Sequence, residues 1–251
     1  MSSIATSSVV FAFVFGGALF GMFLRTVLPK EHLSSESTDV VRMGMGLVST
    51  MSALVLSLLI SGAKSSYDAQ TVALTGASAR IITLDRALAY YGSETKEARE
   101  LLRSCVVGVL DRAWLKLGEN PYPLEGPVSG AAALYNKIEG LAPKDDRQRA
   151  IKAEALNILM GLGQTRWLVF EQVSTSITRP FLIILVSWLA TLFISFGLVA
   201  PRNGTVVTSL LLAALSVSTA VLLILSLYTP FTGLIKISDA PLRAALTQLG
   251  R

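Results

Sequence analysis

The sequence predicts an all-α, four-transmembrane-helix membrane protein, with a helical cytoplasmic domain inserted between the second and third membrane helices. Apolar residues make up 52% of the 251 residues and charged residues only 16%, whereas soluble domains carry about 25% charged residues. The deficit is confined to four nearly uncharged stretches. Each has roughly the 20 residues that a helix needs to cross a hydrocarbon layer of about 30 Å. The segment between the second and third stretches holds most of the charge.

The predicted spans are residues 4–24, 43–63, 181–199 and 206–228. A backbone inside a bilayer must satisfy its own hydrogen bonds, so each stretch is expected to be a helix. No basic residue precedes the first stretch, its apolar run exceeds that of a signal peptide, and no small-residue cleavage site closes it. We therefore expect it to be retained as a span. The chain then divides into residues 1–63, a domain of residues 64–178, and residues 179–251 with an amphipathic tail.

The domain begins with a heptad-like series of apolar residues, typical of a packed helix. Its members are Leu74, Ala77, Ile81, Leu84, Leu88 and Tyr91. No proline interrupts residues 43–91, so the second span is expected to continue beyond the membrane as one helix. Gly92 and Ser93 predict a C-cap followed by the N-cap of a helix ending at Gly118, with Leu117 on its apolar face.

The remaining elements follow from turn and capping signals. Residues 119–130 hold three prolines and two glycines and predict a loop. A short helix follows, and Asp145 or Asp146 is expected to cap a long one. Beyond Pro241, the apolar residues Leu242, Ala245, Leu246 and Leu249 share one face. The sequence predicts that this tail lies on the inner membrane surface.

Charge predicts the orientation and the partners. Four spans place both termini and the domain on one side, and the basic residues Lys64, Arg179, Lys236 and Arg243 favour the cytoplasm for that side. The formal net charge is +5. Anionic membrane lipids are a sufficient partner for this excess, and no nucleic acid is expected.

The residue inventory argues against an enzyme. Cys105 is the only cysteine, which excludes an intrachain disulfide and a cysteine metal cluster. His32 is the only histidine and is expected to be a solvated loop residue. No catalytic constellation, phosphate-binding loop or metal spacing is present, so neither a cofactor nor a metal is expected. The spans hold no ionisable residue, which argues against a proton-coupled transporter but not against a channel.

The second span carries the candidate site. A stripe of small and hydroxyl residues runs along it through Gly46, Thr50, Ala53, Ser57 and Ser61. The stripe either faces a pore or packs against Gly17 and Gly21 of the first span. Packing is the commoner role of such faces in membrane proteins.

An apolar face next to this stripe is the competing pore face, where a ring of side chains from several copies would gate by excluding water. Taken together, the pore-lining candidates are Thr50, Met51, Leu54, Ser57, Leu58 and Ser61. Glu36 and Asp39 precede the span and Lys64 follows it, so these three are candidates for rings of charge at the pore mouths. Ordinary anchoring at the membrane interface is the alternative for all three.

Several long runs of sequence resemble the bacterial bestrophin-like membrane proteins. They are GLVSTMSALVLSLLISGAKSSYDAQ (residues 46–70), ARIITLDRALAYYG (79–92), TRWLVFEQ (165–172), RPFLIILVSWLATLFISFGLVAPRN (179–203) and PFTGLIKIS (230–238). Bestrophins are similar in layout and are pentameric ion channels whose second span lines the pore. The resemblance therefore implies a homo-oligomer, a pentamer, that conducts inorganic ions across the bacterial inner membrane. One departure is that Ser226 and Tyr228 stand where family members carry acidic residues.

Two hypotheses follow. The first is the oligomeric ion channel. The second is a membrane-anchored helical scaffold or sensor that binds a protein partner through its cytoplasmic helices. The heptad-like series from Leu74 to Tyr91 and the absence of polar sites within the membrane are the reasons for the second hypothesis.

Overall fold

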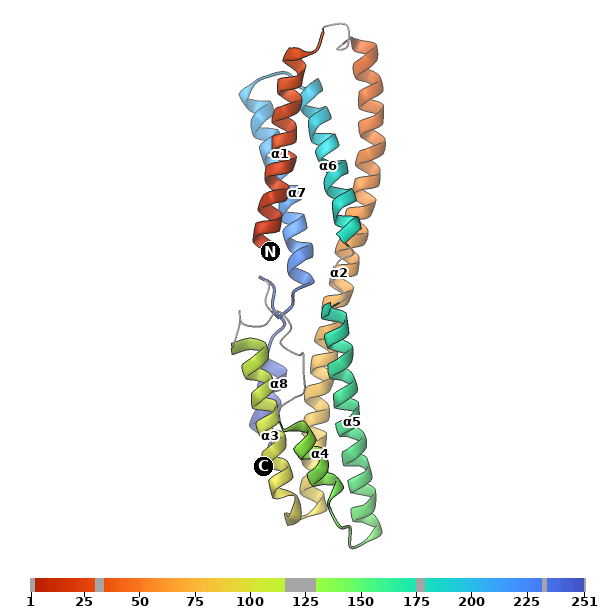
Figure 1. The fold of residues 1–251 in the computed structure, drawn as a ribbon, viewed down its shortest axis with the longest axis vertical. Coiled ribbons are helices and arrows are strands. Elements are labelled where there is room, and N and C mark those ends of the chain that lie inside the picture. The colour runs from red at the N-terminus through yellow and green to blue at the C-terminus, as the bar shows by residue number, and fades with distance from the viewer. Residues whose placement is uncertain (1–2, 30–33, 116–129, 175–178, 232–233, 251) are drawn as a thin grey trace. The chain divides into compact units, whose positions relative to one another are not determined.

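The structure, a computed structural model, describes residues 3–29, 34–115, 130–174, 179–231 and 234–250, and within these ranges all regular structure is helical (Figure 1). The helices are α1 (Ser3–Val27), α2 (Ser35–Tyr91), α3 (Lys96–Leu110), α4 (Ala131–Glu139), α5 (Asp146–Ser174), α6 (Arg179–Val199), α7 (Gly204–Leu227) and α8 (Ala240–Gln248). A 3₁₀ turn, Ser93–Thr95, precedes α3, and a π-helical turn, Asp111–Leu115, follows it.

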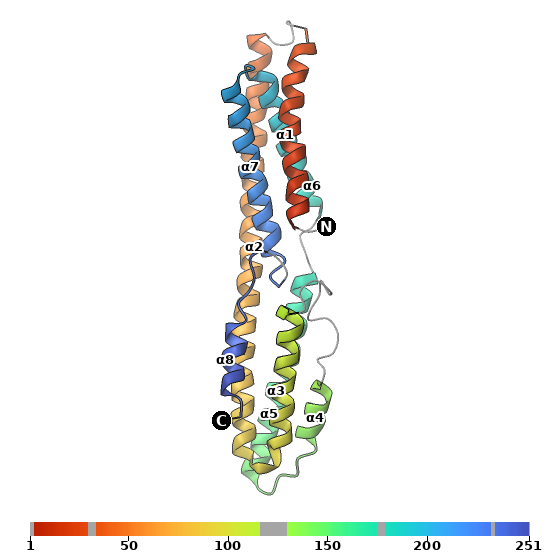
Figure 2. The ribbon, with the colours of Figure 1, turned by 90° about the vertical axis from the view of Figure 1, so that its left-hand side faces the viewer.

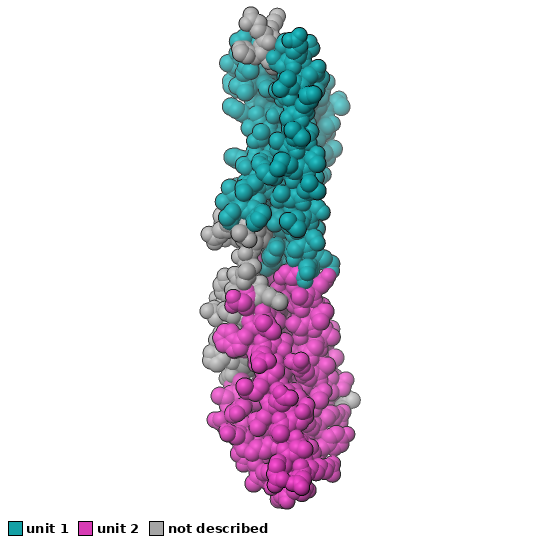
Figure 3. Space-filling model, turned by 90° about the vertical axis from the view of Figure 1, so that its right-hand side faces the viewer, with its two compact units in different colours: residues 1–65, 177–228 teal, residues 66–176, 229–251 magenta. Residues whose placement is uncertain are grey.

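Four described helices are long and apolar enough to cross a membrane: α1, α2, α6 and α7. The prediction of four spans is confirmed at this level, and α2 continues without a break past the end of its apolar stretch, as expected. The chain divides into two compact units, coloured separately in Figure 3. Unit 1 comprises residues 1–65 and 177–228, and unit 2 comprises residues 66–176 and 229–251.

In unit 1, α1 packs against both α6 and α7 (Figures 1 and 2). The shared apolar core consists of Val10, Val14 and Ala18 from α1, Leu185, Leu189 and Phe193 from α6, and Ala214 and Val221 from α7. Ser7 of α1 donates a buried hydrogen bond to the carbonyl oxygen of Ser218 in α7, at 2.6 Å. Three of the four apolar helices therefore form one closely packed group.

Glycines bring α1 and α6 into backbone contact. A Cβ atom on Gly21 would overlap the carbonyl oxygen of Ile194, and a Cβ atom on Gly197 would overlap that of Ala18. Gly17 faces the same helix, and a Cβ atom on it would lie 3.3 Å from Ile194 Cγ1. Small residues allow this close approach because membrane helices gain stability from packing rather than from expulsion of water.

Arg25 and Arg202 connect the adjacent ends of α1 and α6 by hydrogen bonds to backbone carbonyls. Arg25, near the end of α1, donates to the carbonyl oxygens of Val199 and Ala200 at the end of α6. Arg202, just after α6, donates to the carbonyl oxygen of Met22 in α1. The last carbonyls of α6 lack partners within the helix and carry partial negative charge, which the Arg25 guanidinium group satisfies. The Met22 carbonyl lies about one turn before the end of α1.

In unit 2, α3, α4, α5 and α8 share a common apolar core with one side of the later part of α2 (Figures 1 and 2). The α2 contribution is Ile81, Leu84 and Leu88, which belong to the heptad-like series predicted from the sequence. Tyr91 is also buried, and Leu74 packs against the same core. The series therefore packs within its own chain, and this removes the main reason for the scaffold hypothesis.

The C-terminal helix α8 is part of this core. Leu242, Ala245 and Leu249 are buried among side chains of α2, α3, α4 and α5, and Leu246 packs against them. The prediction that this apolar face lies on the membrane surface is wrong. Amphipathic spacing shows that one face seeks an apolar environment, but it does not distinguish lipid from a protein core.

A buried ion pair fastens α2 to α3 and to the C-terminal segment. Asp85 is 1% exposed, and Arg99 donates to its two carboxylate oxygens from Nε at 2.7 Å and from Nη2 at 2.8 Å. The amide of Gly250 donates to the same carboxylate at 3.3 Å. The hydrogen bond with Asp85 raises the pKa of Arg99, so this guanidinium group stays charged and its bonds to the carboxylate are charge-assisted.

The helix ends follow the predicted turn chemistry in part. Gly92 has a φ of 138°, a conformation that favours glycine. The predicted N-cap at Ser93 is wrong, because Ser93 opens a 3₁₀ turn and α3 begins only at Lys96. Asp145 is the cap of α5, since its Oδ1 accepts from the amide of Gln148 at 2.6 Å. His32, Leu117, Gly118 and the predicted loop at 119–129 lie outside the described residues.

The single cysteine should react slowly with thiol reagents in the folded protein. Cys105 is buried in α3, and burial raises the pKa of its thiol. The thiolate is the reactive form, so a raised pKa lowers its fraction at neutral pH. We expect maleimide labelling at pH 7 to be at least tenfold slower in native protein than in protein unfolded by detergent and heat. Equal rates in the two states would contradict the buried position.

Candidate functional site

The part of α2 within unit 1 is exposed over most of its circumference. All six pore-lining candidates are solvent-accessible in the single chain, among them Met51 at 52%, Leu54 at 67% and Leu58 at 66%. Thr50, Ser57 and Ser61 are exposed beside them. At 3.6 residues per turn, the six side chains fall within about one third of the helix circumference. They therefore form one continuous face, which we call the α2 membrane face: Thr50, Met51, Leu54, Ser57, Leu58 and Ser61.

The opposite side of α2 contacts the rest of unit 1. Val55, Leu56 and Leu59 pack against the core formed by α1, α6 and α7, and Ser52 and Ala63 are buried. The α2 membrane face consequently points away from the other three apolar helices. Apolar residues extend it in the N-terminal direction, since Val40, Met43 and Leu47 are also exposed.

The interpretation of the small-residue stripe as packing against the first span is wrong. Gly17 and Gly21 of α1 face α6, and a Cβ atom on Gly46 of α2 would meet no atom within 4 Å. A pair of glycines four residues apart predicts a close helix contact, but it does not identify the partner. Within one chain, the stripe through Gly46, Thr50 and Ser57 has no covering helix.

The charged candidates lie near the two ends of this part of α2. Glu36 is exposed in the first turn of α2. Asp39 forms an exposed salt bridge with Arg42, at 3.0 Å, so its charge is largely compensated. Lys64 is exposed just after the apolar stretch. Among the described residues, no group of three or more metal-ligating side chains is present.

Ser226 and Tyr228, where the resemblance leads us to expect acidic residues, lie in different surroundings. Ser226 is buried near the end of α7. Tyr228 follows α7, and its hydroxyl lies 3.6 Å from the position that a Cβ atom on Gly62 of α2 would occupy. Tyr228, just after α7, thus lies beside the C-terminal end of the α2 membrane face.

Sequence reasoning missed the residues that hold the segment after α7. Tyr67 of α2 donates from its hydroxyl to the carbonyl oxygen of Lys236 at 3.2 Å. Trp114 donates from its indole Nε1 to the carbonyl oxygen of Ile237 at 2.9 Å. Trp114 lies in the π-helical turn, a deviation from α-helix that often marks functional positions. No periodicity in the sequence predicted this turn.

Comparison with known proteins identifies the family. Residues 11–242 match the model of the Bestrophin-like domain. Neither a search of the curated proteins nor a search of the solved structures found a match. The match extends over nearly the whole chain and agrees with the four helices that can cross a membrane. The chain is a membrane protein that belongs to the Bestrophin-like family.

Proposed function

We propose that this protein is a homo-oligomeric ion channel of the bacterial cytoplasmic membrane, with the α2 membrane face lining the pore. The observation that carries the proposal is the position of this face. It lies on the side of α2 opposite to α1, α6 and α7, and its side chains are exposed in the single chain of this membrane-protein family member. Several copies around an axis would bring these faces together.

The chemistry of the face suits ion passage. Hydroxyl groups of Thr50, Ser57 and Ser61 offer oxygen ligands, while Leu54 and Leu58 provide an apolar constriction that gates by excluding water. Thr50 Oγ1 already donates to the carbonyl oxygen of Gly46 at 2.9 Å, which leaves its lone pairs facing outward as acceptors. The proposal assigns no catalytic residue, no cofactor and no metal.

Charge enters the proposal at the two mouths. A ring of Glu36 side chains would lie at the outer mouth and a ring of Lys64 side chains at the inner one, with both termini and unit 2 in the cytoplasm. Because Asp39 is paired with Arg42, it contributes little to the outer ring. The pentameric stoichiometry is proposed from the family resemblance.

Cysteine accessibility along α2 tests the proposal. We expect purified protein in planar bilayers to carry ionic current, and a charged thiosulfonate reagent to reduce that current in Ser57→Cys and Ser61→Cys. The native Cys105 is buried and serves as an internal blank. Leu59→Cys is the matched control, since Leu59 packs against the core of unit 1. Absence of current, or block at Leu59 without block at Ser57, would refute the proposal.

A further inference from the structure

On the outside of unit 2, helices α2 and α3 expose different kinds of side chain. On α2, the exposed residues Val72, Gly76, Ala79 and Thr83 follow one another at helical spacing. By contrast, the exposed side of α3 carries Lys96, Glu97, Glu100 and Arg103 and reads as a solvated face. We call the former surface, from Val72 to Tyr90, the outer α2 face.

The neighbouring helix α5 exposes large apolar side chains. Met160 is 58% exposed, Trp167 57% and Leu168 64%. These residues, with Ala153, Asn157 and Gln164, form the outer α5 face. These residues lie outside the four predicted membrane spans, so lipid does not explain their exposure. Apolar side chains grouped in this way on a water-facing domain mark a surface that another protein covers.

Each face contains a glycine in the middle of a helix. A Cβ atom on Gly76 of α2 or on Gly163 of α5 would meet no atom within 4 Å. Glycine in a helix interior costs about 0.5–1 kcal/mol relative to alanine, and among the residues that the structure describes no contact requires its small size at either position. A second helix packed closely against these faces would require it.

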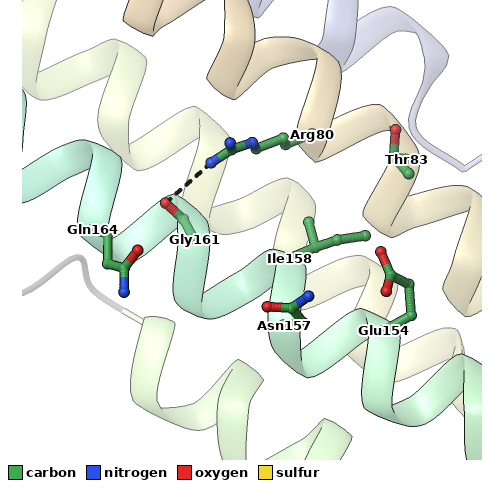
Figure 4. Close-up of a pocket in the computed structure, with 7 residues that line it drawn as sticks. All are labelled: Arg80, Thr83, Glu154, Asn157, Ile158, Gly161 and Gln164. Carbon is green, nitrogen blue, oxygen red and sulfur yellow. Dashed lines mark hydrogen bonds between the residues drawn. The ribbon is translucent and has the colours of Figure 1, made fainter.

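A groove with complementary charge runs between the two faces. It has a volume of about 420 Å³ and is lined from α2 by Arg80 and Thr83 and from α5 by Glu154 and Asn157, among others (Figure 4). Arg80 is held within the chain, since its Nη1 donates to the carbonyl oxygen of Gly161 at 3.4 Å and to Thr165 Oγ1 at 3.3 Å. Glu154 has no hydrogen bond or salt bridge with any residue that the structure describes.

The level of these charges along the helices restricts what meets them. Thr83 and Glu154 line the same groove, so they lie at about the same height on antiparallel helices. Arg86 is exposed on the outer α2 face one turn beyond Thr83. Copies inserted in one membrane share their orientation, so a residue meets only residues at its own height in a neighbouring copy. Gln148 of α5 donates to the carbonyl oxygen of Tyr91 in α2 at 3.0 Å. On these antiparallel helices Arg86, five residues before Tyr91, is therefore about level with Glu154, six residues after Gln148, and the same holds between one copy and the next.

We propose that the outer α2 face of one copy packs against the outer α5 face of a second copy, with Arg86 opposite Glu154 across the contact. Each copy then contacts one neighbour through its outer α2 face and the other neighbour through its outer α5 face. Such a contact repeats around an axis and closes into a ring when the rotation allows it. The proposal rests on the oligomeric assembly proposed above and identifies the surface that holds it together.

Gly76→Trp tests the close approach. Gly76 is exposed and a Cβ atom there would meet no atom within 4 Å, so the variant is expected to fold but to shift the purified protein from oligomer to monomer in mass photometry. Ser104→Trp on the exposed side of α3 is the matched control and should remain oligomeric. Slow labelling of Cys105 in each variant verifies that unit 2 is folded. A folded Gly76→Trp variant with unchanged oligomeric mass would overturn the proposal.

Charge reversal tests the pairing. Arg86→Glu and Glu154→Arg should each lose most of the oligomer, because like charges then face each other, and the double variant should recover it. If the double variant forms no more oligomer than either single variant, with all three folded, the Arg86–Glu154 contact is rejected.

The outcomes separate the two proposals. A wild-type oligomer without current removes the channel and leaves the interface, whereas current in an undissociated Gly76→Trp protein removes the interface and leaves the channel.

Discussion

Replacing Gly21 by alanine is expected to destabilise unit 1 by about 3 kcal/mol or more, at the upper end of the cost of overpacking a core. The added methyl group would overlap the backbone of Ile194, which cannot move aside as a flexible side chain can. The temperature at which detergent-solubilised protein stops eluting as a single peak should fall markedly.

Gly16→Ala is the matched control for this change. Gly16 lies in the same helix, but a Cβ atom there would meet no atom within 4 Å. The control should match or slightly exceed the stability of the natural protein, since alanine is the better helix former by up to about 1 kcal/mol. Equal losses for Gly16→Ala and Gly21→Ala would show that the crossing of α1 and α6 is not as close as described.

Asp85→Ala should be the most damaging single change in unit 2. It leaves Arg99 and the Gly250 amide without the carboxylate to which they donate. Breaking a buried ion pair by removing one partner costs about 3–5 kcal/mol. The lower end applies here, because the Arg99 side chain keeps 20% exposure and regains some hydration. The rate of Cys105 labelling as temperature rises measures the loss, because opening of unit 2 exposes that thiol.

A surface ion pair provides the comparison for Asp85. Asp146 and Arg149 form a salt bridge in which the two side chains are 94% and 68% exposed. Exposed pairs contribute about 0–1 kcal/mol because water screens them. Asp146→Ala should therefore leave the labelling profile almost unchanged. An Asp85→Ala profile that coincides with it would mean that the buried pair does not hold α2, α3 and the C-terminal segment together.

Much of the fold follows from where charge is absent. The four uncharged stretches predict α1, α6, α7 and the apolar part of α2, because only a helix satisfies a backbone inside a bilayer. The cap at Asp145 and the glycine at Gly92 follow from local chemistry that needs no tertiary information. The regular spacing of small or apolar residues along a helix, by contrast, shows that one face is covered but not what covers it. The glycines of α1 and the apolar side of α8 were assigned to the wrong partners for this reason.

The candidate site was predictable only in part. Spacing placed six residues of α2 on one face, but whether that face is covered within the chain depends on the packing of α1 with α6 and α7. The π-helical turn that presents Trp114 leaves no mark in the pattern of apolar residues. Tyr67 and Trp114 donate to backbone carbonyls, which every residue carries. The type of the accepting residue therefore does not reveal such contacts in the sequence.

The burial of α8 has a consequence for biosynthesis. Leu242, Ala245 and Leu249 complete a core whose other members are translated between Ile81 and Ile158, so α6 and α7 must be made and inserted before the last side chains arrive. At about 5–20 residues per second this delay is on the order of ten seconds. During that time the apolar side chains that α8 later covers stay uncovered in the nascent unit 2, and in a chain that ends before α8 they would stay so.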